Sequence, residues 1–410
     1  MLRTFLTFAI LGGPLSADEW PQFRGANGQG VIDASNVPVK IDFDKNLVWE
    51  TSIPGKGWSS PVMSEGLVVV TTAVGLENIE LRVIAMDFET GKIVWDQLVF
   101  EPTVEEAGVR HAKNSLASST PFISDGVVYA HFGHMGTAAL SLKSGKVVWR
   151  FHQTYPSKHG NGGSPVVIDG MLIFTADGEE KALLRGLDAK TGKLVWEIDR
   201  EKEVRQKFSF GTPVVVPGRD GPLVVSQGSG MVGAYQAASG KLVWSVDYGE
   251  GFSVVPRPVV DDGFVYVTTG FGLPNLLAIS LEGAEGDVTK THVKWRAKRD
   301  IPKTPSFVIS GDLIYLVDDT GRLSCLEKES GERLWMEPLM RNISASLTLV
   351  EDRLYTFTEE GIAFVHQVGR DGAVLLAEND FKEPVFASPV VADNTLIVRS
   401  QSRIRRFSRN

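Results

Sequence analysis

The sequence predicts an all-β protein, namely an eight-bladed β-propeller whose blades are four-stranded antiparallel sheets. Three observations predict this fold class. An eleven-residue pattern ending in tryptophan recurs along the chain, a second short pattern recurs eight times, and the two ends of the chain are complementary incomplete units. Successive tryptophans lie 40 residues apart between Trp295 and Trp335 and 54 apart between Trp95 and Trp149. This range is typical of a propeller blade.

The eleven-residue pattern is clearest at residues 85–95, which read AMDFETGKIVW. Further copies lie at 139–149, 186–196, 234–244 and 325–335. Apolar residues alternate on both sides of a Thr/Ser-Gly turn, so each copy predicts two strands joined by a tight hairpin. Glycine suits this turn because it adopts positive φ without a Cβ clash.

The second pattern is a short segment of mostly small residues, with proline in most copies. Its eight copies begin at residues 59, 119, 163, 211, 256, 303, 344 and 387. A strand at 47–53 precedes the first copy and has no hairpin partner, whereas residues 387–407 supply only three strands. We therefore expect the strand at 47–53 to complete the last blade and close the ring, which would remove exposed sheet edges.

The first residues predict export. Residues 1–17 combine Arg3, a short apolar run at 5–11 and a small-residue site at 15–17, as in a secretory signal peptide cleaved after Ala17. The alternative is an uncleaved interfacial anchor, since the run is far shorter than the ~20 residues that span a bilayer. Residues 18–45 are expected to form a non-repeating leader or cap, and residues 46–410 a single propeller domain. The mature protein is expected to be periplasmic or secreted.

Composition limits the function classes. The net charge of −8 argues against nucleic-acid binding, which requires a basic face. Cys325 is the single cysteine, so no intramolecular disulfide can form. It replaces the small first residue of a repeat and is expected to be a buried, inert thiol.

At residues 85–95 the pattern A-x-D-x-x-T-G-x-x-x-W resembles the tryptophan-docking motif of quinoprotein-type (PQQ-like) eight-bladed propellers. Other copies keep the glycine and tryptophan but carry Ser141, Gln236 or Glu327 in place of the aspartate, and the copy at 278–295 contains an insertion. The resemblance covers about residues 46–410. It implies that the tryptophan of one blade packs on the turn of a neighbouring blade. The family includes pyrroloquinoline quinone (PQQ) dehydrogenases and BamB-type outer-membrane assembly scaffolds.

Candidate ligand-binding residues lie in the loops that lead into the innermost strands, because these loops surround one mouth of a propeller channel. Two of these lead-in loops are unusually polar, at 110–118 and 158–164, and we expect His111 and His159 to face each other. The candidates are Trp58, His111, Lys113, Asn114, His159, Asn161, Arg257, Lys303 and Asn342, with Arg205, Lys207 and Arg341 as further possibilities. Such cations favour a carboxylate, a polyanionic quinone or an acidic peptide. The alternative is that they are solvated loop residues. No catalytic residue or metal site is predicted.

We therefore expect an exported, monomeric scaffold similar to BamB-type proteins, without a cofactor, that binds envelope proteins or peptides or a small anionic ligand. The alternative is a PQQ-dependent alcohol or sugar dehydrogenase. That enzyme would need carboxylate and amide oxygens to hold calcium and a carboxylate base. No lead-in loop carries such a cluster, and Trp58 is the only tryptophan placed to stack on a quinone. BamB-type scaffolds are usually lipid-anchored, and the chain lacks the cysteine for this linkage.

Overall fold

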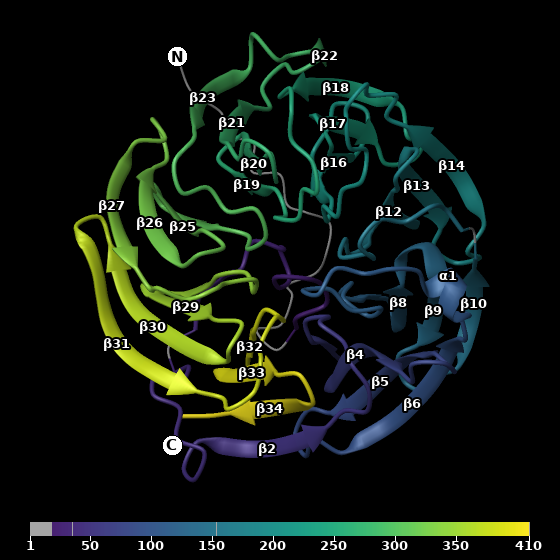
Figure 1. Cartoon of the computed structure of the whole chain (residues 1–410), viewed down its shortest axis with the longest axis vertical. Helices are drawn as coiled ribbons and strands as arrows, with labels where there is room; N and C mark the ends of the chain where they lie inside the picture. Colours follow the sequence, from purple (N-terminus) through teal and green to yellow (C-terminus); the bar gives the residue numbers. More distant parts are fainter. Residues whose placement is uncertain (1–18, 35, 153, 410) are drawn as a thin grey trace.

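The computed structural model describes residues 19–34, 36–152 and 154–409. The expected signal peptide, residues 1–17, lies outside the described residues. Within them, eight sheets stand around a central axis (Figure 1), so the predicted eight-bladed propeller is confirmed.

Each blade is a meander whose strands run from the axis outward. The strands of blades 1 to 4 are β3 (Val62–Ser64), β4 (Leu67–Val74), β5 (Glu80–Asp87), β6 (Ile93–Phe100); β7 (Phe122–Ser124), β8 (Val127–His131), β9 (Thr137–Ser141), β10 (Val147–Phe151); β11 (Val166–Ile168), β12 (Met171–Asp177), β13 (Ala182–Asp188), β14 (Leu194–Asp199); β15 (Val214–Val216), β16 (Leu223–Gly228), β17 (Met231–Gln236) and β18 (Leu242–Asp247).

Blades 5 to 8 follow the same order. Their strands are β19 (Val259–Asp261), β20 (Phe264–Thr268), β21 (Leu276–Ser280), β23 (Val293–Ala297); β24 (Val308–Ser310), β25 (Leu313–Val317), β26 (Arg322–Glu327), β27 (Arg333–Pro338); β28 (Thr348–Val350), β29 (Arg353–Phe357), β30 (Ile362–Gly369), β31 (Gly372–Asp380); β32 (Val390–Ala392), β33 (Thr395–Arg399), β34 (Arg403–Phe407) and β2 (Leu47–Ser52). Inner strands such as β12 are buried throughout because neighbouring blades cover both faces, whereas the outer β27 is mostly exposed.

The tryptophans join neighbouring blades as the resemblance implied. Trp95 of blade 1 donates from Nε1 to Leu142 O of blade 2 at 2.8 Å. A Cβ on Gly145, which has φ +70°, would lie 2.6 Å from the Trp95 ring. The turn therefore requires glycine both for its backbone conformation and for the space that the indole takes.

The insertion at 278–295 changes this arrangement at one junction. Its residues Gly286–Asp287 form β22, which pairs in parallel with β18 at Trp244 and Ser245. Trp244 is thereby almost completely buried. The insertion thus adds a fifth, outermost strand to blade 4.

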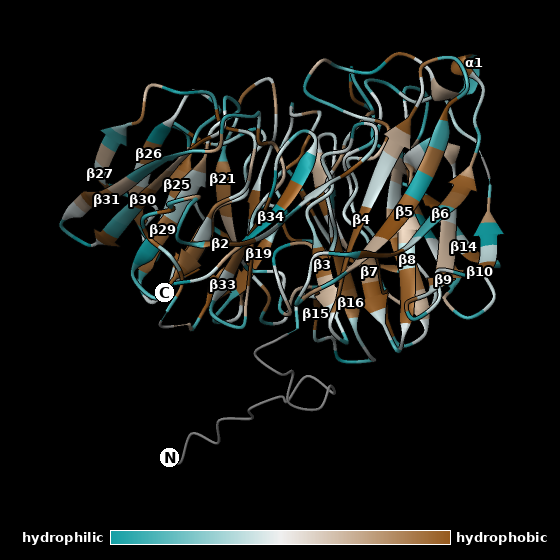
Figure 2. Cartoon of the chain, turned by 90° about the horizontal axis from the view of Figure 1, so that it is seen from below, coloured by the Kyte–Doolittle hydropathy of each residue, from teal (hydrophilic) through white to brown (hydrophobic). Residues whose placement is uncertain are grey.

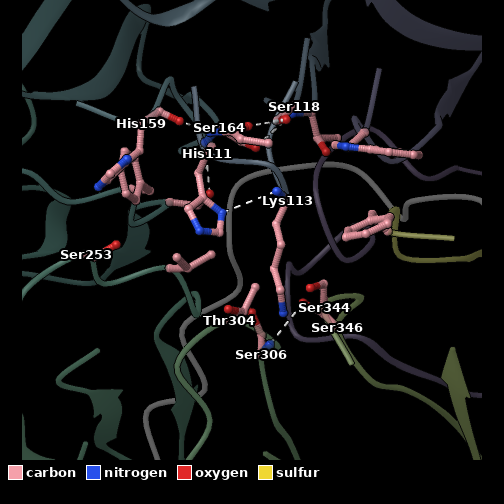
Figure 3. Close-up of a pocket in the computed structure, with 18 of the residues that line it drawn as sticks. His111, Lys113, Ser118, His159, Ser164, Ser253, Thr304, Ser306, Ser344 and Ser346 are labelled. Carbon is pink, nitrogen blue, oxygen red and sulfur yellow. Dashed lines mark hydrogen bonds between the residues drawn. The ribbon is translucent and has the colours of Figure 1, made fainter. Parts of the chain in front are cut away.

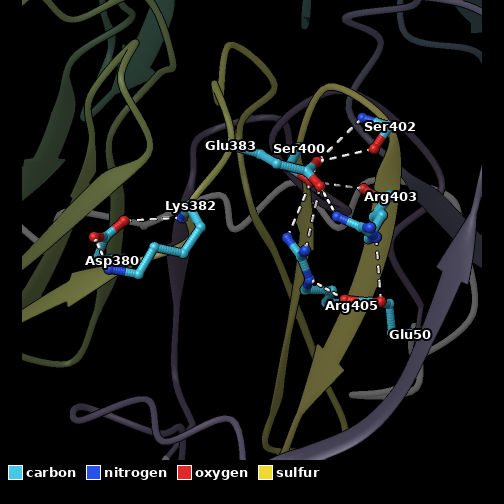
Figure 4. A network of polar contacts seen from close by, with 8 residues as sticks. All are labelled: Glu50, Asp380, Lys382, Glu383, Ser400, Ser402, Arg403 and Arg405. Carbon is cyan, nitrogen blue, oxygen red and sulfur yellow. Dashed lines mark hydrogen bonds and ion pairs between the residues drawn. The ribbon is translucent and has the colours of Figure 1, made fainter.

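The predicted ring closure is confirmed. β2 pairs antiparallel with β34, and Glu50 lies opposite Arg405. Glu50 accepts hydrogen bonds from Arg405 Nε at 2.6 Å, and its other oxygen lies 3.2 Å from Arg403 Nε. Glu383, from the loop before β32, pairs with both arginines and accepts from Ser400 Oγ at 2.7 Å (Figure 4). The first strand of the propeller is therefore held by main-chain pairing and by ion pairs.

The leader crosses the axis on one face of the ring, where Figure 1 draws it in purple at the centre. Trp20 pairs with Met63 of blade 1, and Pro21 O accepts from Ile123 N of blade 2 at 2.7 Å. At its other end β1 (Val31–Ile32) pairs in parallel with β28 of blade 7. The leader thus connects blades 1 and 2 with blade 7, which blade 8 separates from blade 1.

His131 gives the fold a defined response to acid. Its ring is buried against Phe174 of blade 3, and its Nδ1 lies 2.8 Å from Thr137 Oγ1. Burial lowers the pKa of His131 to about 3, with the charge of Arg185 as a smaller cause. Between about pH 6.5 and this value the unfolded chain takes up a proton that the folded chain does not, so stability falls as pH falls.

We expect His131→Asn, whose amide lies where Nδ1 contacts Thr137, to flatten this dependence. Each fully linked proton changes the free energy of unfolding by about 1.4 kcal/mol per pH unit. Urea unfolding of both proteins at several pH values between 4 and 7 measures the difference between them. Equal slopes would contradict the assignment to His131.

Candidate functional site

The central channel is open at one mouth and closed at the other. A cavity of about 300 Å³ lies on the axis among the lead-in loops. Phe23 of the leader lines it, so the leader closes the far end. The open face carries the lead-in loop of blade 2 with the short helix α1 (Val104–Ala107), at the upper edge of Figure 2. We call this cavity the funnel.

Seven hydroxyl side chains form the floor of the funnel, one from each of seven blades. In each bond a backbone N–H donates to the hydroxyl of a neighbouring blade: Ser60 to Thr120, Thr120 to Ser164 and Ser164 to Thr212 at 2.9 Å, then Arg257 to Ser306 and Ser306 to Ser346 at 3.0 Å, Ser346 to Ser388 at 2.9 Å and Ser388 to Ser60 at 3.0 Å. All seven hydroxyl residues are buried and line the funnel. We call this set the hydroxyl ring.

Arg257 takes the place of a hydroxyl residue in blade 5, and it does not lie at the open mouth as we expected. Its guanidinium is buried and turned toward the leader, where NH1 donates to Phe23 O at 2.6 Å and NH2 to Gln22 Oε1 at 2.8 Å. A Cβ on Gly28, which has φ +71°, would lie 2.2 Å from Arg257 NH1. The leader glycines therefore let the backbone pass close to this arginine.

Aromatic side chains form one wall of the funnel. Phe208 contacts Phe210 and Phe252 with ring centroids 6.1 and 5.8 Å apart, and Phe252 contacts Phe271 at 6.4 Å. We call these four residues the aromatic wall. Trp58 also lines the funnel, and Phe386 stacks on it at 4.5 Å.

The two histidines meet as predicted, because their lead-in loops belong to adjacent blades. The His111 and His159 rings lie edge to face at 5.7 Å, and His159 continues to Phe208 at 5.3 Å. Asn114 Nδ2 donates to His159 O at 2.9 Å, which fixes the two loops together. Burial lowers the pKa of His159, with the charges of His111 and Lys158 as further causes. His159 is therefore mainly neutral at neutral pH.

Lys113 reaches across the funnel (Figure 3). It comes from the lead-in loop of blade 2, yet its Nζ lies 2.6 Å from Glu359 Oε1 of blade 7. Ser344 Oγ donates to the same carboxylate oxygen at 2.6 Å. The Lys113 charge is thus compensated within the protein, which reduces its value for an external anion.

The remaining candidates do not line the funnel. Asn161 is buried, and its amide donates to Ser119 Oγ at 2.5 Å, so it supports the loops. Asn342 lines a separate surface pocket together with Arg341. Lys303 lies beside the aromatic wall, with its Nζ 5.1 Å from the Phe271 ring centroid. Arg205 is exposed and Lys207 partly buried in the lead-in loop of blade 4, and neither lines the funnel.

Sequence reasoning missed the aromatic wall and the hydroxyl ring, although a signal for the ring was present. Trp58, Phe210 and Phe386 each lie two positions before a ring hydroxyl. In blade 6 the repeat pattern placed Thr304 at the ring position, whereas the structure places Ser306 there. The copy that begins at 344 is also displaced, because its ring hydroxyl is Ser346 in the third place, so these two copies concealed the regularity.

The funnel residues do not fit calcium-held PQQ. No aspartate or glutamate is among the described residues that line the funnel, and one face of Trp58 is covered by Phe386. In the described ranges no three His, Cys, Asp or Glu side chains come together in a way that could bind a metal ion. Calcium requires several oxygen ligands, commonly carboxylates.

Comparison with known proteins gives a matching family model, related sequences and similar solved structures. A family model described as outer membrane protein assembly factor BamB matches residues 29–181, 180–339 and 291–375. The factor of that name from Yersinia pestis is 27% identical over 395 residues, which cover 91% of each chain. BamB from Moraxella catarrhalis superimposes with a TM-score of 0.64 at 14% identity and covers 88% of this chain and 96% of that one. A europium-containing methanol dehydrogenase gives a TM-score of 0.71 at 11% identity, covering 96% and 98%, which shows a shared fold alone.

Proposed function

We propose that this chain, which belongs to the family of outer membrane protein assembly factor BamB, is an exported scaffold that binds an outer membrane protein or another component of its assembly. The binding surface is the face around the open funnel. The chain acts as a monomer and needs no cofactor. In the part of the chain that the structure describes, no helix has the length and apolarity to cross a bilayer.

The observation that carries this proposal is a set of exposed apolar side chains around the mouth. Leu76 is 81% exposed, Val109 87%, Leu273 68% and Met340 81%. Strands alternate in direction, so the loop after the second strand of a blade and the loop after the fourth lie on the same face. Leu76 and Leu273 occupy the first kind of loop, and Val109 and Met340 the second. Such apolar groups surrounding a polar-floored cavity are typical of a surface that binds another protein.

Site-specific crosslinking tests this surface. A photo-crosslinking amino acid at Val109 or Met340, in the full chain produced in a diderm bacterium, is expected to yield adducts with outer membrane proteins or their assembly components, identified by mass spectrometry. Matched controls are Val94 and Val148, which are 50% and 56% exposed on outer strands of blades 1 and 2. Equal adducts from both pairs of positions would reject the mouth as the binding surface.

The proposal that the protein needs no cofactor can be tested by measuring the binding of PQQ and calcium. The lack of carboxylates among the described funnel residues and the covered face of Trp58 support it. Calorimetric titration of the mature protein with PQQ and calcium is expected to give no specific heat. Micromolar binding that is lost in His159→Ala would instead support the dehydrogenase alternative.

A further inference from the structure

The hydroxyl ring has unused hydrogen-bond donors. Each ring hydroxyl accepts a backbone N–H from the preceding blade, yet no described residue accepts its own proton. The neighbouring blades occupy the other sides, so the side left to these protons is the funnel that all seven residues line. Buried hydroxyl donors are normally satisfied. Seven donors that converge on one axis are suited to a ligand with several acceptor atoms.

Three buried arginines surround the floor without a carboxylate partner among the described residues. Arg257 occupies the eighth ring position, Arg24 donates to Phe307 O next to Ser306 at 2.5 Å, and Arg399 donates to Ser59 O next to Ser60 at 3.0 Å. Two nitrogens of Arg24, Nε and NH1, have no hydrogen-bond partner in the described structure.

Burial lowers the pKa of Arg24 to about 9, with the charge of Arg257 as a second cause, and it lowers the pKa of Arg257 to about 10 and that of Arg399 to about 9. All three remain cationic at neutral pH. Uncompensated buried charges are costly, so an anion on the axis would stabilise this arrangement.

The wall of the funnel further limits which anion fits. Above the hydroxyl ring lie the rings of Phe208, Phe210, Phe252 and Phe271, and no free lysine or arginine lines the cavity among the described residues, because Lys113 is paired with Glu359. A phosphate group would favour direct bidentate contact with arginine. A carboxylate with an apolar body fits better, and about 300 Å³ accommodates a small acid or the end of a peptide.

We propose that the hydroxyl ring binds the carboxylate of an amphipathic acid whose apolar or aromatic body packs on the aromatic wall. The carboxylate accepts from ring hydroxyls, and the buried arginines supply a favourable potential without touching it. Since the leader closes the opposite end, the ligand enters and leaves through the open mouth.

Calorimetry with a charged and a neutral probe of the same shape tests whether the site requires a carboxylate. The mature protein is expected to bind 3-phenylpropionate with a dissociation constant of about 1 mM or tighter, as is reasonable for a ligand of this size. The neutral 3-phenylpropionamide, of the same shape, is expected to bind at least about tenfold more weakly. Equal binding of acid and amide, or no binding of either, would overturn the proposal.

Variants of Thr120 test whether the hydroxyl ring is the binding site. Thr120→Val removes a donor and is expected to weaken binding of 3-phenylpropionate about tenfold, whereas Thr120→Ser keeps the hydroxyl and the affinity. Thr72→Val loses a partly buried hydrogen bond, from Thr72 Oγ1 to Pro54 O, outside the funnel, and controls for general destabilisation. Wild-type affinity in Thr120→Val would exclude the ring as the site. The comparison of acid and amide decides the question even if Thr120→Val fails to fold.

The carboxylate can come from a small metabolite or from the end of a polypeptide. N-acetyl-alanyl-leucine, with a free or an amidated terminus, distinguishes the two sources. Tighter binding of the free peptide than of 3-phenylpropionate indicates a chain end, and the reverse order indicates a small acid. Crosslinking at Val109 in Thr120→Val reports separately on the proposed scaffold function, because Val109 lies outside the funnel.

Discussion

Replacing Arg200 by methionine is expected to lower the free energy of unfolding by about 3–5 kcal/mol, because Asp177 would remain buried without its counter-ion. Arg200 Nε lies 3.3 Å from Asp177 Oδ1, and neither side chain is exposed. The same guanidinium donates to Ser226 Oγ at 2.8 Å and to Tyr235 OH at 3.4 Å, both in the next blade. The substitution therefore removes an ion pair and a junction between blades 3 and 4.

The loss should depend on pH. Burial raises the pKa of Asp177 to about 6, although the charge of Arg200 opposes this shift. Without Arg200 the opposition disappears, so the carboxyl takes up a proton more readily. We expect urea unfolding to show a larger loss at pH 8 than at pH 5, where Asp177 is mostly neutral in both proteins. Arg200→Met/Asp177→Asn should recover part of the stability at pH 8. A double variant as unstable as the single one would contradict the charge argument.

The second large effect is expected at the closure of the ring. Trp49→Ala should cost about 3–5 kcal/mol, as for other buried aromatic side chains. Trp49 packs on Gly91 and donates from Nε1 to Phe88 O at 2.8 Å, so it joins β2 of the last blade to blade 1. β2 is not continuous in the chain with the other strands of blade 8 and is held there by main-chain pairing and by the ion pairs of Glu50, so the variant should also release this strand.

Limited proteolysis followed by mass spectrometry measures the release, with cleavage expected within β2. Trp149→Ala is the matched control, since Trp149 packs on Gly192 and donates to Ala189 O at 2.9 Å between blades that follow each other in the chain. It should destabilise the protein without early cleavage of β2. The same cleavage pattern in both variants would show that closure is no weaker than an internal junction.

The fold was predictable because each repeat contains the residues that its own turn and its packing on the next blade require. Gly145 and Trp95 are needed at fixed spacing wherever one blade packs on the next, and the unpaired strand at 47–53 implies closure. The β22 strand was not predictable in the same way. Its pairing with Trp244 is parallel and joins residues about forty positions apart, with no periodic pattern in the insertion.

The candidate site was predictable only where the repeat placed it. His111 and His159 meet because adjacent lead-in loops must be neighbours. The position of Arg257 depended instead on the leader, which has no repeat, and on contacts such as that with Gln22, which is 235 residues away in sequence. A cationic side chain in a lead-in loop therefore indicated charge near the axis but not the direction in which it points.

The course of the leader also fixes how the molecule would be oriented when held by its amino-terminal end. Trp20 joins the ring beside Met63, on the face opposite the lead-in loops. A support or lipid surface attached close to Trp20 would lie beneath that face, and the exposed apolar side chains around the mouth, here called the rim, which include Val109 and Met340, would point away from it. An amino-terminal tag used for immobilisation should therefore leave the rim accessible, whereas capture through that rim would cover it.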